Sequence, residues 1–321
     1  MMSNTILDVK DLKVRFTTDE GDVSTVNGVT FSITEGETLA IVGESGSGKS
    51  VTSLALVGLL PPNGEIYNGS VEFNGTDLRG LSSKEYRALR GNEISMIFQE
   101  PMTALNPVFT IGFQLREMLI VHSKLTRKQA TLRGVEMLER VGIPDAEKTM
   151  KRFPHQLSGG MRQRVMIAIA LSCNPSLLIA DEPTTALDVT IEAQILALLR
   201  ELKRKSNTSI IIITHNLGVV AELADRVIVM YAGEIVEEAS VFELFENPLH
   251  PYTRGLLASM PRLHDVVDNL YSIEGTVPDP AHMPSGCKFA PRCPMADRDC
   301  TAAHPELKFV SADHAVRCIK V

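Results

Sequence analysis

The chain has 321 residues, of which 44% are hydrophobic and 22% are charged, close to the composition of an ordinary globular protein. This length allows one large domain and a small one. The formal net charge is −7, and an acidic balance argues against broad binding to nucleic acid or to an anionic membrane surface. The sequence has no apolar run near the roughly 18 residues of a membrane span, and its first twenty residues lack the apolar stretch of a signal peptide. We therefore expect a cytoplasmic protein.

Two segments near the start of the chain alternate apolar and polar residues, as half-buried strands do. Residues 7–16 alternate except for a slip in parity at Lys10–Asp11, which suggests a β-bulge. Residues 29–33 alternate without interruption. Strands with one apolar and one polar face are typical of an antiparallel sheet with one solvated side. The pattern therefore predicts an antiparallel β region here.

Three short apolar runs without a polar face predict buried parallel strands, at residues 38–43, 176–181 and 209–214. Helical patterns lie between them, and the clearest runs from Thr126, a candidate N-cap, to Gly142, with Pro144 beyond. Strands that alternate with helices indicate an α/β core. A shift in composition toward Cys and Pro near residues 250–265 marks the start of a small C-terminal extension.

Residues 43–50 read GESGSGKS and match the phosphate-loop pattern G-x-x-x-x-G-K-[ST] between an apolar strand and a helical pattern. The glycines allow backbone N–H groups to curl around phosphate oxygens, and the helix N-terminus adds partial positive charge. Lys49 would reach the β- and γ-phosphates, and Ser50 would hold Mg²⁺. The nucleotide contacts predicted for this loop come from Gly43, Glu44, Ser45, Gly46, Ser47, Gly48, Lys49, Ser50 and Val51.

Two further segments supply candidate nucleotide chemistry. A buried strand ends in Asp181 and Glu182. Asp181 is placed to contact Mg²⁺, usually through water, and Glu182 to polarise the water that attacks the γ-phosphate. Ser158, Gly159 and Gly160 open a helix that we expect to be amphipathic, and they form a second anion-binding helix start. The chain thus has two phosphate-binding helix starts but only one lysine and one set of Mg²⁺ contacts. This combination fits a head-to-tail dimer better than a monomer.

With these motifs the chain resembles the ATP-binding subunits of ATP-binding-cassette (ABC) transporters over about residues 5–260. The resemblance implies a P-loop NTPase cassette: an α/β, RecA-like core with an antiparallel β region and a helical subdomain at about residues 100–170. It also implies that Phe16 stacks on adenine, that Gln99 is the Q-loop glutamine and that Ser158–Gly160 form the signature. In the same way it implies a D-loop at Ala186–Leu187–Asp188 and a switch histidine at His215.

The family's mechanism assigns roles to these residues. The resemblance implies Glu182, His215 and Gln99 as the catalytic residues, and Ser50, Gln99 and Asp181 as the residues around Mg²⁺. It implies two cassettes with ATP between them, held by Gly43–Ser50 of one subunit and Ser158–Gly160 of the other. Two positions depart from the family pattern, because Met161 replaces a common Gln and Asn216 replaces a common Asp. Since Glu182 and His215 are intact, we expect hydrolysis.

The C-terminal part narrows the resemblance to oligopeptide and dipeptide transporter ATPases. Residues 247–257, 102–107 and 230–237 and the cysteine-containing segment resemble that subfamily. We therefore expect a nucleotide-binding domain at 5–260 and a C-terminal extension at 261–321. The implied partners are a second, homologous ATPase in a heterodimer, two permease subunits and, indirectly, a periplasmic or extracellular peptide-binding protein. The chain would lie peripherally on the cytoplasmic face of the inner membrane, with glutathione or a nickel complex as alternative cargo.

Four cysteines fall in the last 35 residues, with spacings of 5, 6 and 17 intervening residues. Disulfides are disfavoured for a cytoplasmic chain, and structural zinc usually shows C-x₂₋₄-C pairs, which are absent. An iron–sulfur cluster tolerates wider spacing, and the resemblance implies one. We favour a [4Fe–4S] cluster, with zinc or free thiols as alternatives, on Cys287, Cys293, Cys300 and Cys318.

Two other functional classes compete with peptide import. Soluble ABC ATPases that act on DNA or ribosomes typically carry two cassettes or a long coiled-coil insertion. This chain has one cassette, only about a hundred residues between phosphate loop and signature, and an acidic charge that disfavours nucleic acid. A sensor that uses the same kind of permease is the other alternative. The intact Glu182 and His215 argue against a catalytically silent sensor.

Overall fold

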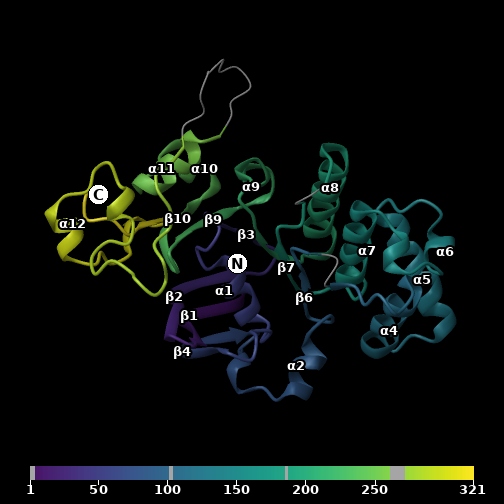
Figure 1. Ribbon diagram of the computed structural model, residues 1–321. Helices are drawn as coiled ribbons and strands as arrows, with labels where there is room; N and C mark the ends of the chain where they lie inside the picture. Colours follow the sequence, from purple (N-terminus) through teal and green to yellow (C-terminus); the bar gives the residue numbers. More distant parts are fainter. Residues whose placement is uncertain (1–3, 101–103, 185–186, 261–271) are drawn as a thin grey trace. The chain divides into compact units, whose positions relative to one another are not determined.

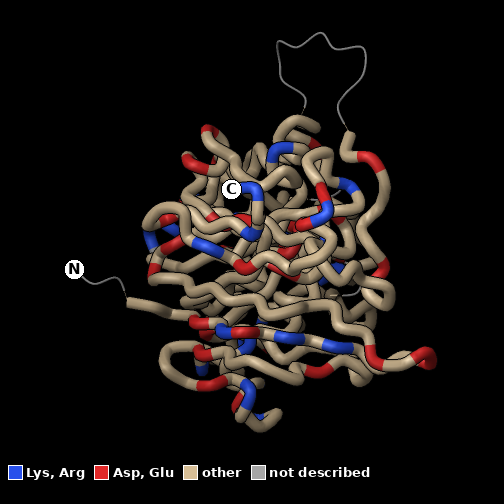
Figure 2. The backbone as a smooth tube through the Cα atoms, turned by 90° about the vertical axis from the view of Figure 1, so that its left-hand side faces the viewer, with Lys and Arg blue, Asp and Glu red and all other residues tan. Residues whose placement is uncertain are grey.

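The residues that the computed structural model describes are 4–100, 104–184, 187–260 and 272–321 (Figure 1). They divide into two compact units. The first unit consists of residues 4–6, 33–38 and 80–212. The second unit consists of residues 7–32, 39–79 and the described part of 213–321. In the view of Figure 2, acidic and basic residues are interspersed along the backbone without a long segment of one sign.

The second unit contains a four-stranded sheet in the order β2-β1-β4-β5. Its elements are β1 (Thr5–Thr18), β2 (Gly21–Thr34), β4 (Gly64–Phe73) and β5 (Thr76–Asp77), followed by the 3₁₀ turn η1 (Leu78–Gly80). β4 is antiparallel to both β1 and β5, which confirms the predicted antiparallel region. The bulge is confirmed as well, because the register shifts after Lys10 and Asp11 has a φ of 45°. The extra residue keeps Val9 and Leu12 on the same buried face.

The strands of the second unit's core run in the order β11-β12-β10-β9-β3. They are β3 (Thr38–Val42), β9 (Arg226–Tyr231), β10 (Glu234–Ser240), β11 (Lys308–Ser311) and β12 (His314–Val316). β3 is parallel to β9, and β10 is antiparallel to both β9 and β12. The C-terminal extension therefore adds two strands to the edge of β10, where its yellow ribbon lies in Figure 1.

Short helices complete the second unit. They are α1 (Lys49–Leu56), α9 (Leu217–Leu223), α10 (Val241–Glu246), α11 (Pro251–Ala258) and α12 (Arg298–Ala302), with the 3₁₀ turn η3 (Ala290–Arg292). α10 packs against β9, β10 and α9. Among the residues that the structure describes, no helix has both the length and the apolar character to cross a membrane.

The first unit contains the strands β6 (Ile94–Ile97), β7 (Leu177–Asp181) and β8 (Ser209–Ile213), with β7 between the other two. β6 and β7 are parallel, and every residue of β7 and β8 is buried, as the apolar runs predicted. The helices are α2 (Ser83–Leu89), α4 (Ile111–Ser123), α5 (Arg127–Arg140), α6 (Ala146–Thr149), α7 (Gly159–Leu171) and α8 (Val189–Ser206), with the 3₁₀ turn η2 (Pro154–Gln156).

The helices α4, α5 and α7 pack against one another within the first unit (Figure 1). The predicted ends of α5 are confirmed, because Thr126 caps it in a capping box with Gln129 and Gly142 follows it with a φ of 71°. The amphipathic pattern predicted for α7 is wrong. Four consecutive residues, Val165–Ala168, are buried, so this helix is covered on all sides rather than along one stripe.

A buried carboxylate fastens the extension to β10. Glu237, on β10, is fully buried and accepts hydrogen bonds from the backbone N–H groups of Leu249 (2.7 Å) and His250 (2.9 Å). Its Oε1 atom also lies 2.8 Å from Nε2 of His314, on β12. One side chain thus ties together β10, the segment before α11 and the last strand of the chain.

We expect Glu237→Ala to destabilise the second unit by about 3–5 kcal/mol, because it leaves two buried groups and one half-buried group without their acceptor. The measurement is the shift of the urea unfolding midpoint. The matched control is Glu246→Ala, which removes an exposed carboxylate and should change stability by less than about 0.5 kcal/mol. Equal effects of the two substitutions would contradict the role of Glu237.

Candidate nucleotide site

The phosphate loop lies in the second unit, between β3 and α1. Three of its glycines have positive φ: 154° at Gly43, 80° at Gly46 and 97° at Gly48. A Cβ at Gly43 would lie 2.3 Å from the carbonyl oxygen of Met230, so this position also lacks room for a side chain. Gly48 stands directly before α1, and the loop therefore presents backbone N–H groups beside the start of a helix.

Lys49 holds the loop from inside. Its Nζ atom donates hydrogen bonds to the carbonyl oxygens of Gly43 (2.7 Å) and Glu44 (2.8 Å), and to Oγ of Ser47 (3.3 Å). The side chain is 7% exposed, whereas Ser45 and Gly46 at the tip of the loop are exposed. The lysine is thus buried beneath an open loop, at the position where a phosphate-binding cation is expected.

Glu44 is held from outside the loop by residues that the sequence did not indicate. Its carboxylate accepts two hydrogen bonds from Arg292, with Nη1–Oε2 and Nη2–Oε1 distances of 2.6 and 3.0 Å. Its backbone N–H donates to the hydroxyl of Tyr252 at 2.8 Å. Burial raises the pKa of Tyr252 above its usual range, so this hydroxyl remains protonated. Nothing in the local sequence connects Arg292 with a loop 248 residues away.

The acidic residues of the candidate site lie in the first unit, at the end of β7. Asp181 is buried, and Glu182 is half-buried with a φ of 47°. A positive φ is uncommon for a residue with a side chain, and active sites are one of the places where such conformations cluster. Nε2 of Gln99 donates a 3.2 Å hydrogen bond to Oε2 of Glu182. The structure therefore brings together two of the three predicted catalytic residues.

The signature segment forms the start of α7, also in the first unit. Ser158 is the N-cap, and its Oγ atom accepts a hydrogen bond from the N–H of Met161. Ser158 and Gly159 are exposed, so this helix start is open to another molecule. Met161 contributes its backbone to the cap, which any residue can do.

Gln163 was not predicted, and its Nε2 atom donates a 2.8 Å hydrogen bond to the carbonyl oxygen of Pro183, next to Glu182.

The remaining predicted residues have local structural roles as well. Phe16 on β1 is half-buried and packs over Gly64, its partner on β4. His215 is exposed after β8 and belongs to the second unit. Asn216 caps α9, since its side chain accepts a 2.9 Å hydrogen bond from Gly218 N–H. Asn and Asp are equally good in that position, which accounts for the departure from Asp.

The D-loop is described only in part. Ala186 lies outside the described residues, whereas Leu187 and Asp188 lie within them. Asp188 caps α8, because its Oδ1 atom accepts a 3.0 Å hydrogen bond from Ile191 N–H. Its side chain is therefore committed to starting the helix that follows.

The four cysteines of the extension, all free thiols, line one small pocket together with His250, Phe289 and Lys320. Within the described parts of the chain, no group of three or more His, Cys, Asp or Glu side chains is arranged to hold a single metal ion. The pocket is therefore a site where the four thiols converge without the geometry of a closed zinc site.

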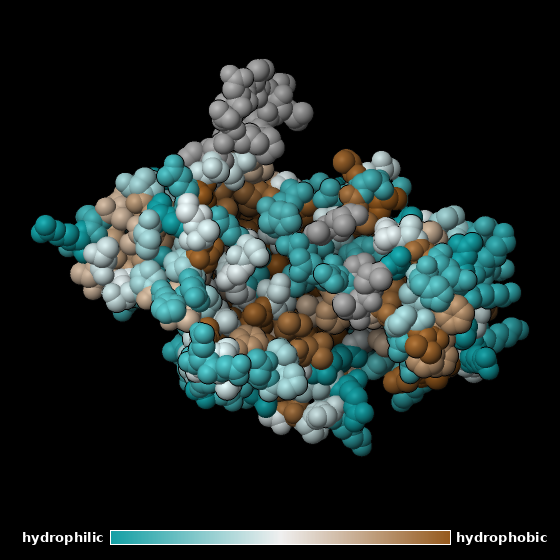
Figure 3. All heavy atoms as spheres, in the orientation of Figure 1, coloured by the Kyte–Doolittle hydropathy of each residue, from teal (hydrophilic) through white to brown (hydrophobic). Residues whose placement is uncertain are grey.

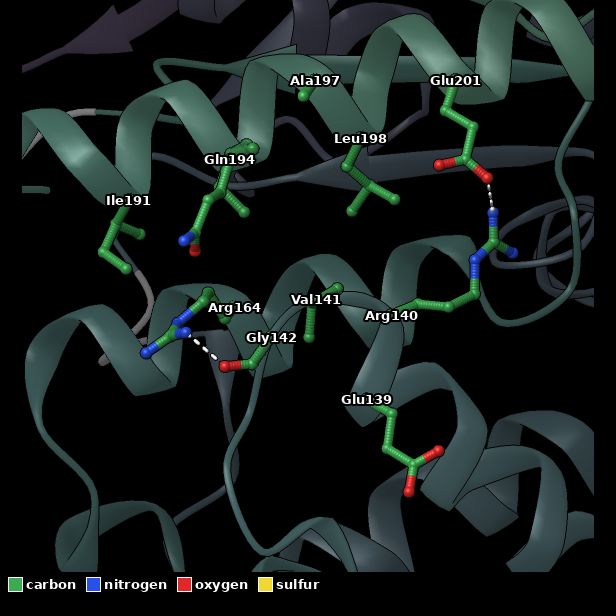
Figure 4. A pocket seen from close by; sticks show the side chains of 11 residues that line it. Glu139, Arg140, Val141, Gly142, Arg164, Ile191, Gln194, Ala197, Leu198 and Glu201 are labelled. Carbon is green, nitrogen blue, oxygen red and sulfur yellow. Dashed lines mark hydrogen bonds and ion pairs between the residues drawn. The ribbon is translucent and has the colours of Figure 1, made fainter.

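A second pocket, of about 450 Å³, lies within the first unit, between the ends of α5 and α7 on one side and α8 on the other (Figure 4). One contact crosses it, since Arg140 lies 3.8 Å from Glu201 of α8, whereas Arg164 donates to the carbonyl oxygen of Gly142 at 2.5 Å on the side of α5 and α7. The residues that line it include none predicted for the nucleotide. It marks the junction between the helical subdomain and α8.

Comparisons with known proteins define the class. Residues 26–185 match the family model described as ABC transporter. The fold is similar to the post-hydrolysis dimer of the ATP-binding cassette MJ0796 bound to ADP and Pi, with a TM-score of 0.68 and 28% identity over 73% of this chain and 98% of that one. The chain has the fold of an ABC cassette, and it is an ATP-binding protein with ATPase activity.

A second family model, described as oligopeptide/dipeptide transporter, C-terminal region, matches residues 236–300. The oligopeptide transport ATP-binding protein AppD of Bacillus subtilis is 56% identical over 98% of this chain and 96% of its own length. The dipeptide transport ATP-binding protein DppD of the same organism is 53% identical, over 98% and 94%. The chain therefore belongs to the oligopeptide/dipeptide transport ATP-binding proteins of the ABC transporter family.

We expect Glu182→Gln to retain ATP binding and to slow hydrolysis by about 10²–10⁴-fold, because the substitution removes a general base while keeping its shape. Lys49→Ala is the contrasting variant, and it should weaken ATP binding itself. Steady-state hydrolysis and equilibrium binding of MgATP measure the two effects separately. Near wild-type turnover by Glu182→Gln would exclude Glu182 as the base, and an unchanged affinity in Lys49→Ala would contradict the role of Lys49.

Proposed function

We propose that this chain powers the import of oligopeptides or dipeptides by hydrolysing ATP beside membrane permease subunits. The observation that carries the proposal is the match of residues 236–300 to the peptide-transporter model, which continues from the ABC cassette into the C-terminal extension. Relatives named for oligopeptide and dipeptide transport match nearly the whole chain. Oligopeptides are the first candidate cargo, dipeptides the second, and glutathione or a nickel complex the alternatives.

In this proposal each predicted residue has a role in the ATP cycle. Gly43–Val51 hold the phosphates, Phe16 stacks on adenine, and Ser158–Gly160 cover the nucleotide of the neighbouring subunit, with Asp188 beside them. Ser50, Gln99 and Asp181 would surround Mg²⁺, which lowers the charge that the phosphates present to the attacking water. Glu182 polarises that water, and His215 contacts the γ-phosphate. The hydrogen bond between Gln99 and Glu182 supports this assignment, because it connects a proposed metal contact with the proposed base.

We propose that α4 and the residues before it contact the permease. This segment exposes Val108, Phe109, Phe113, Ile120 and Val121, and brown atoms gather over the α4–α5 part of Figure 3. The Phe109 and Phe113 rings stack with centroids 4.5 Å apart. Clustered apolar side chains on a surface mark interaction sites. Because Gln99 precedes this segment, permease movement and the catalytic residues would be coupled over a short stretch of chain.

The remaining assignments follow from this role. The nucleotide-binding domain would span residues 5–260 and the extension residues 261–321. The neighbouring ATPase would be a homologous second subunit, so that the pair is a heterodimer. The assembly would lie on the cytoplasmic face of the inner membrane, peripheral to the permease and without nucleic acid as a partner. The peptide would reach it through a binding protein outside the membrane.

We propose in addition a [4Fe–4S] cluster on Cys287, Cys293, Cys300 and Cys318. All four line one pocket. In a zinc site all the sulfur atoms share one ion at about 2.3 Å, whereas in such a cluster each cysteine ligates a different iron. The convergence of all four thiols on one pocket is the observation that supports the cluster, and it fits zinc as the alternative. The cluster would supply structural support or redox sensitivity.

Protein purified without oxygen should contain iron and absorb visible light as an iron–sulfur protein does. Cys300→Ser should lose both signals, whereas Cys173→Ser, the matched control outside the extension, should retain them. Iron content and the visible spectrum are the measurements. A wild-type protein without iron and with a featureless spectrum would overturn the cluster, and stoichiometric zinc would favour the alternative.

The import function is tested by uptake of labelled dipeptides and tripeptides into cells that carry this subunit together with its permease and binding-protein partners. Uptake should fall to background with Glu182→Gln and stay at the wild-type rate with Glu147→Gln, which alters an exposed carboxylate. Peptide uptake that Glu182→Gln leaves intact would refute the energy-coupling role. Wild-type cells that hydrolyse ATP but take up no peptide would refute the peptide cargo.

A further inference from the structure

The side chain of Arg292 is almost completely buried, with 5% exposed, and it meets Glu44 in a two-point ion pair. Arg292 is the last residue of η3 in the C-terminal extension, whereas Glu44 is the second residue of the phosphate loop. Planar two-point pairs between guanidinium and carboxylate are among the strongest and most directional polar contacts in proteins. This contact therefore fixes one side of the loop to the extension.

The guanidinium group of Arg292 is also held in place by contacts other than those with the loop. Its Nε and Nη2 atoms donate to the carbonyl oxygens of Glu274 (2.9 Å) and Ile273 (3.2 Å). Its Nη1 atom donates to the Tyr231 hydroxyl at 3.4 Å, and the guanidinium carbon lies 5.8 Å from the centre of that ring. Hydrogen bonding to Glu44 raises the pKa of Arg292, so the group stays charged. A cation fixed in this way is presented to Glu44 without further ordering.

The extension also supports the loop from behind. Tyr252, which accepts the Glu44 N–H, packs against Tyr231 and against Phe289 of the extension, with ring centroids 4.7 and 5.4 Å away. Lys288 donates to the carbonyl oxygen of Ala232, in the turn between β9 and β10. The next residue in that turn, Gly233, donates its N–H to the carbonyl oxygen of Ser47. Residues 288–292 of the extension are thus connected to the loop twice, through Glu44 and, by way of the β9–β10 turn, through Ser47.

The electrostatic consequence concerns the nucleotide. A carboxylate on a loop that binds polyphosphate repels the ligand, and repulsion between like charges is strong where solvent is partly excluded. The Glu44 side chain is 29% exposed, so water screens it only in part. Arg292 compensates this charge at hydrogen-bonding distance, and its two-point contact fixes the orientation of the carboxylate.

We propose that Arg292 of the C-terminal extension is a positioning residue for ATP: by pairing with Glu44 it neutralises and orients the phosphate loop, and the extension is thereby part of the nucleotide site. Arg292 contacts the loop and not the reacting atoms, so it acts on affinity for ATP rather than on the chemical step. The effect depends on Glu44, because the charge that Arg292 cancels is the one that would repel the phosphates.

The test measures MgATP affinity by equilibrium binding to the full-length chain, and KM and kcat in the assembled transporter. We expect Arg292→Gln to weaken MgATP binding by about tenfold and to raise KM by a similar factor, with kcat within about twofold of wild type. Arg292→Lys, which keeps the charge but not the two-point geometry, should lose about threefold. Arg298→Gln, an exposed arginine of the same extension, should leave affinity unchanged.

The decisive comparison uses Glu44→Gln as the background. There, adding Arg292→Gln should change MgATP affinity by less than about threefold, because the repelling charge is gone. An equal loss in both backgrounds would overturn the proposal, since it would mean that Arg292 only supports the fold. An unchanged affinity in Arg292→Gln alone would overturn it as well. If Arg292→Gln does not fold, Arg292→Lys in the two backgrounds provides the same comparison at smaller amplitude.

Discussion

The phosphate loop must keep backbone N–H groups turned toward an anion, and the structure around it depends on this requirement. Bulky side chains cannot stabilise such a loop, because Gly43 and Gly48 have positive φ and leave no room for a Cβ atom. Its stability comes from groups that surround it. Lys49 bonds to the loop carbonyls from within, and the β9–β10 turn bonds to Ser47 from behind. Glu44 works against the binding of an anion, because its side chain adds a negative charge to the loop.

In the first unit, too, a functional residue is held in place by hydrogen bonds from surrounding residues. Glu182 has a backbone conformation that is unfavourable for a residue with a side chain, and it is kept there by its neighbours. Gln99 bonds to its carboxylate, and Gln163 bonds to the carbonyl oxygen of Pro183 beside it. Gln163 lies on α7 five residues after Ser158, so one hydrogen bond joins the signature helix to the residue that follows the proposed base.

Sequence alone predicted those features that local chemistry determines. The bulge after Lys10 follows from a break in alternation, and the start of α5 follows from Thr126 as a candidate N-cap, to which the structure adds Gln129 in a capping box. The phosphate loop is contiguous and could be identified from its letters. The cap formed by Asn216 is also determined locally, since Asn directly precedes an apolar helical run.

Features that depend on distant parts of the chain could not be predicted in this way. Nothing near Arg292 marks it as the partner of Glu44, because the pair depends on how the extension packs against the rest of the second unit. The error over α7 has the same origin. Its pattern predicts one apolar stripe, whereas α4, α5 and β6 pack against it and four consecutive residues are buried. Propensity and periodicity describe an element, but its surroundings decide how much of it is buried.

The position of Arg292 in the chain links the loop to the cysteine pocket. The turn that carries it is closed by hydrogen bonds from Ala290 N–H to the carbonyl of Cys287 and from Cys293 N–H to the carbonyl of Ala290. Cys287 and Cys293 both line the pocket. A group bound by these thiols, as proposed above, would fix both ends of the turn that carries Arg292. Together with the proposed action of Arg292 on Glu44, such a group would make ATP affinity depend on the state of the cysteines.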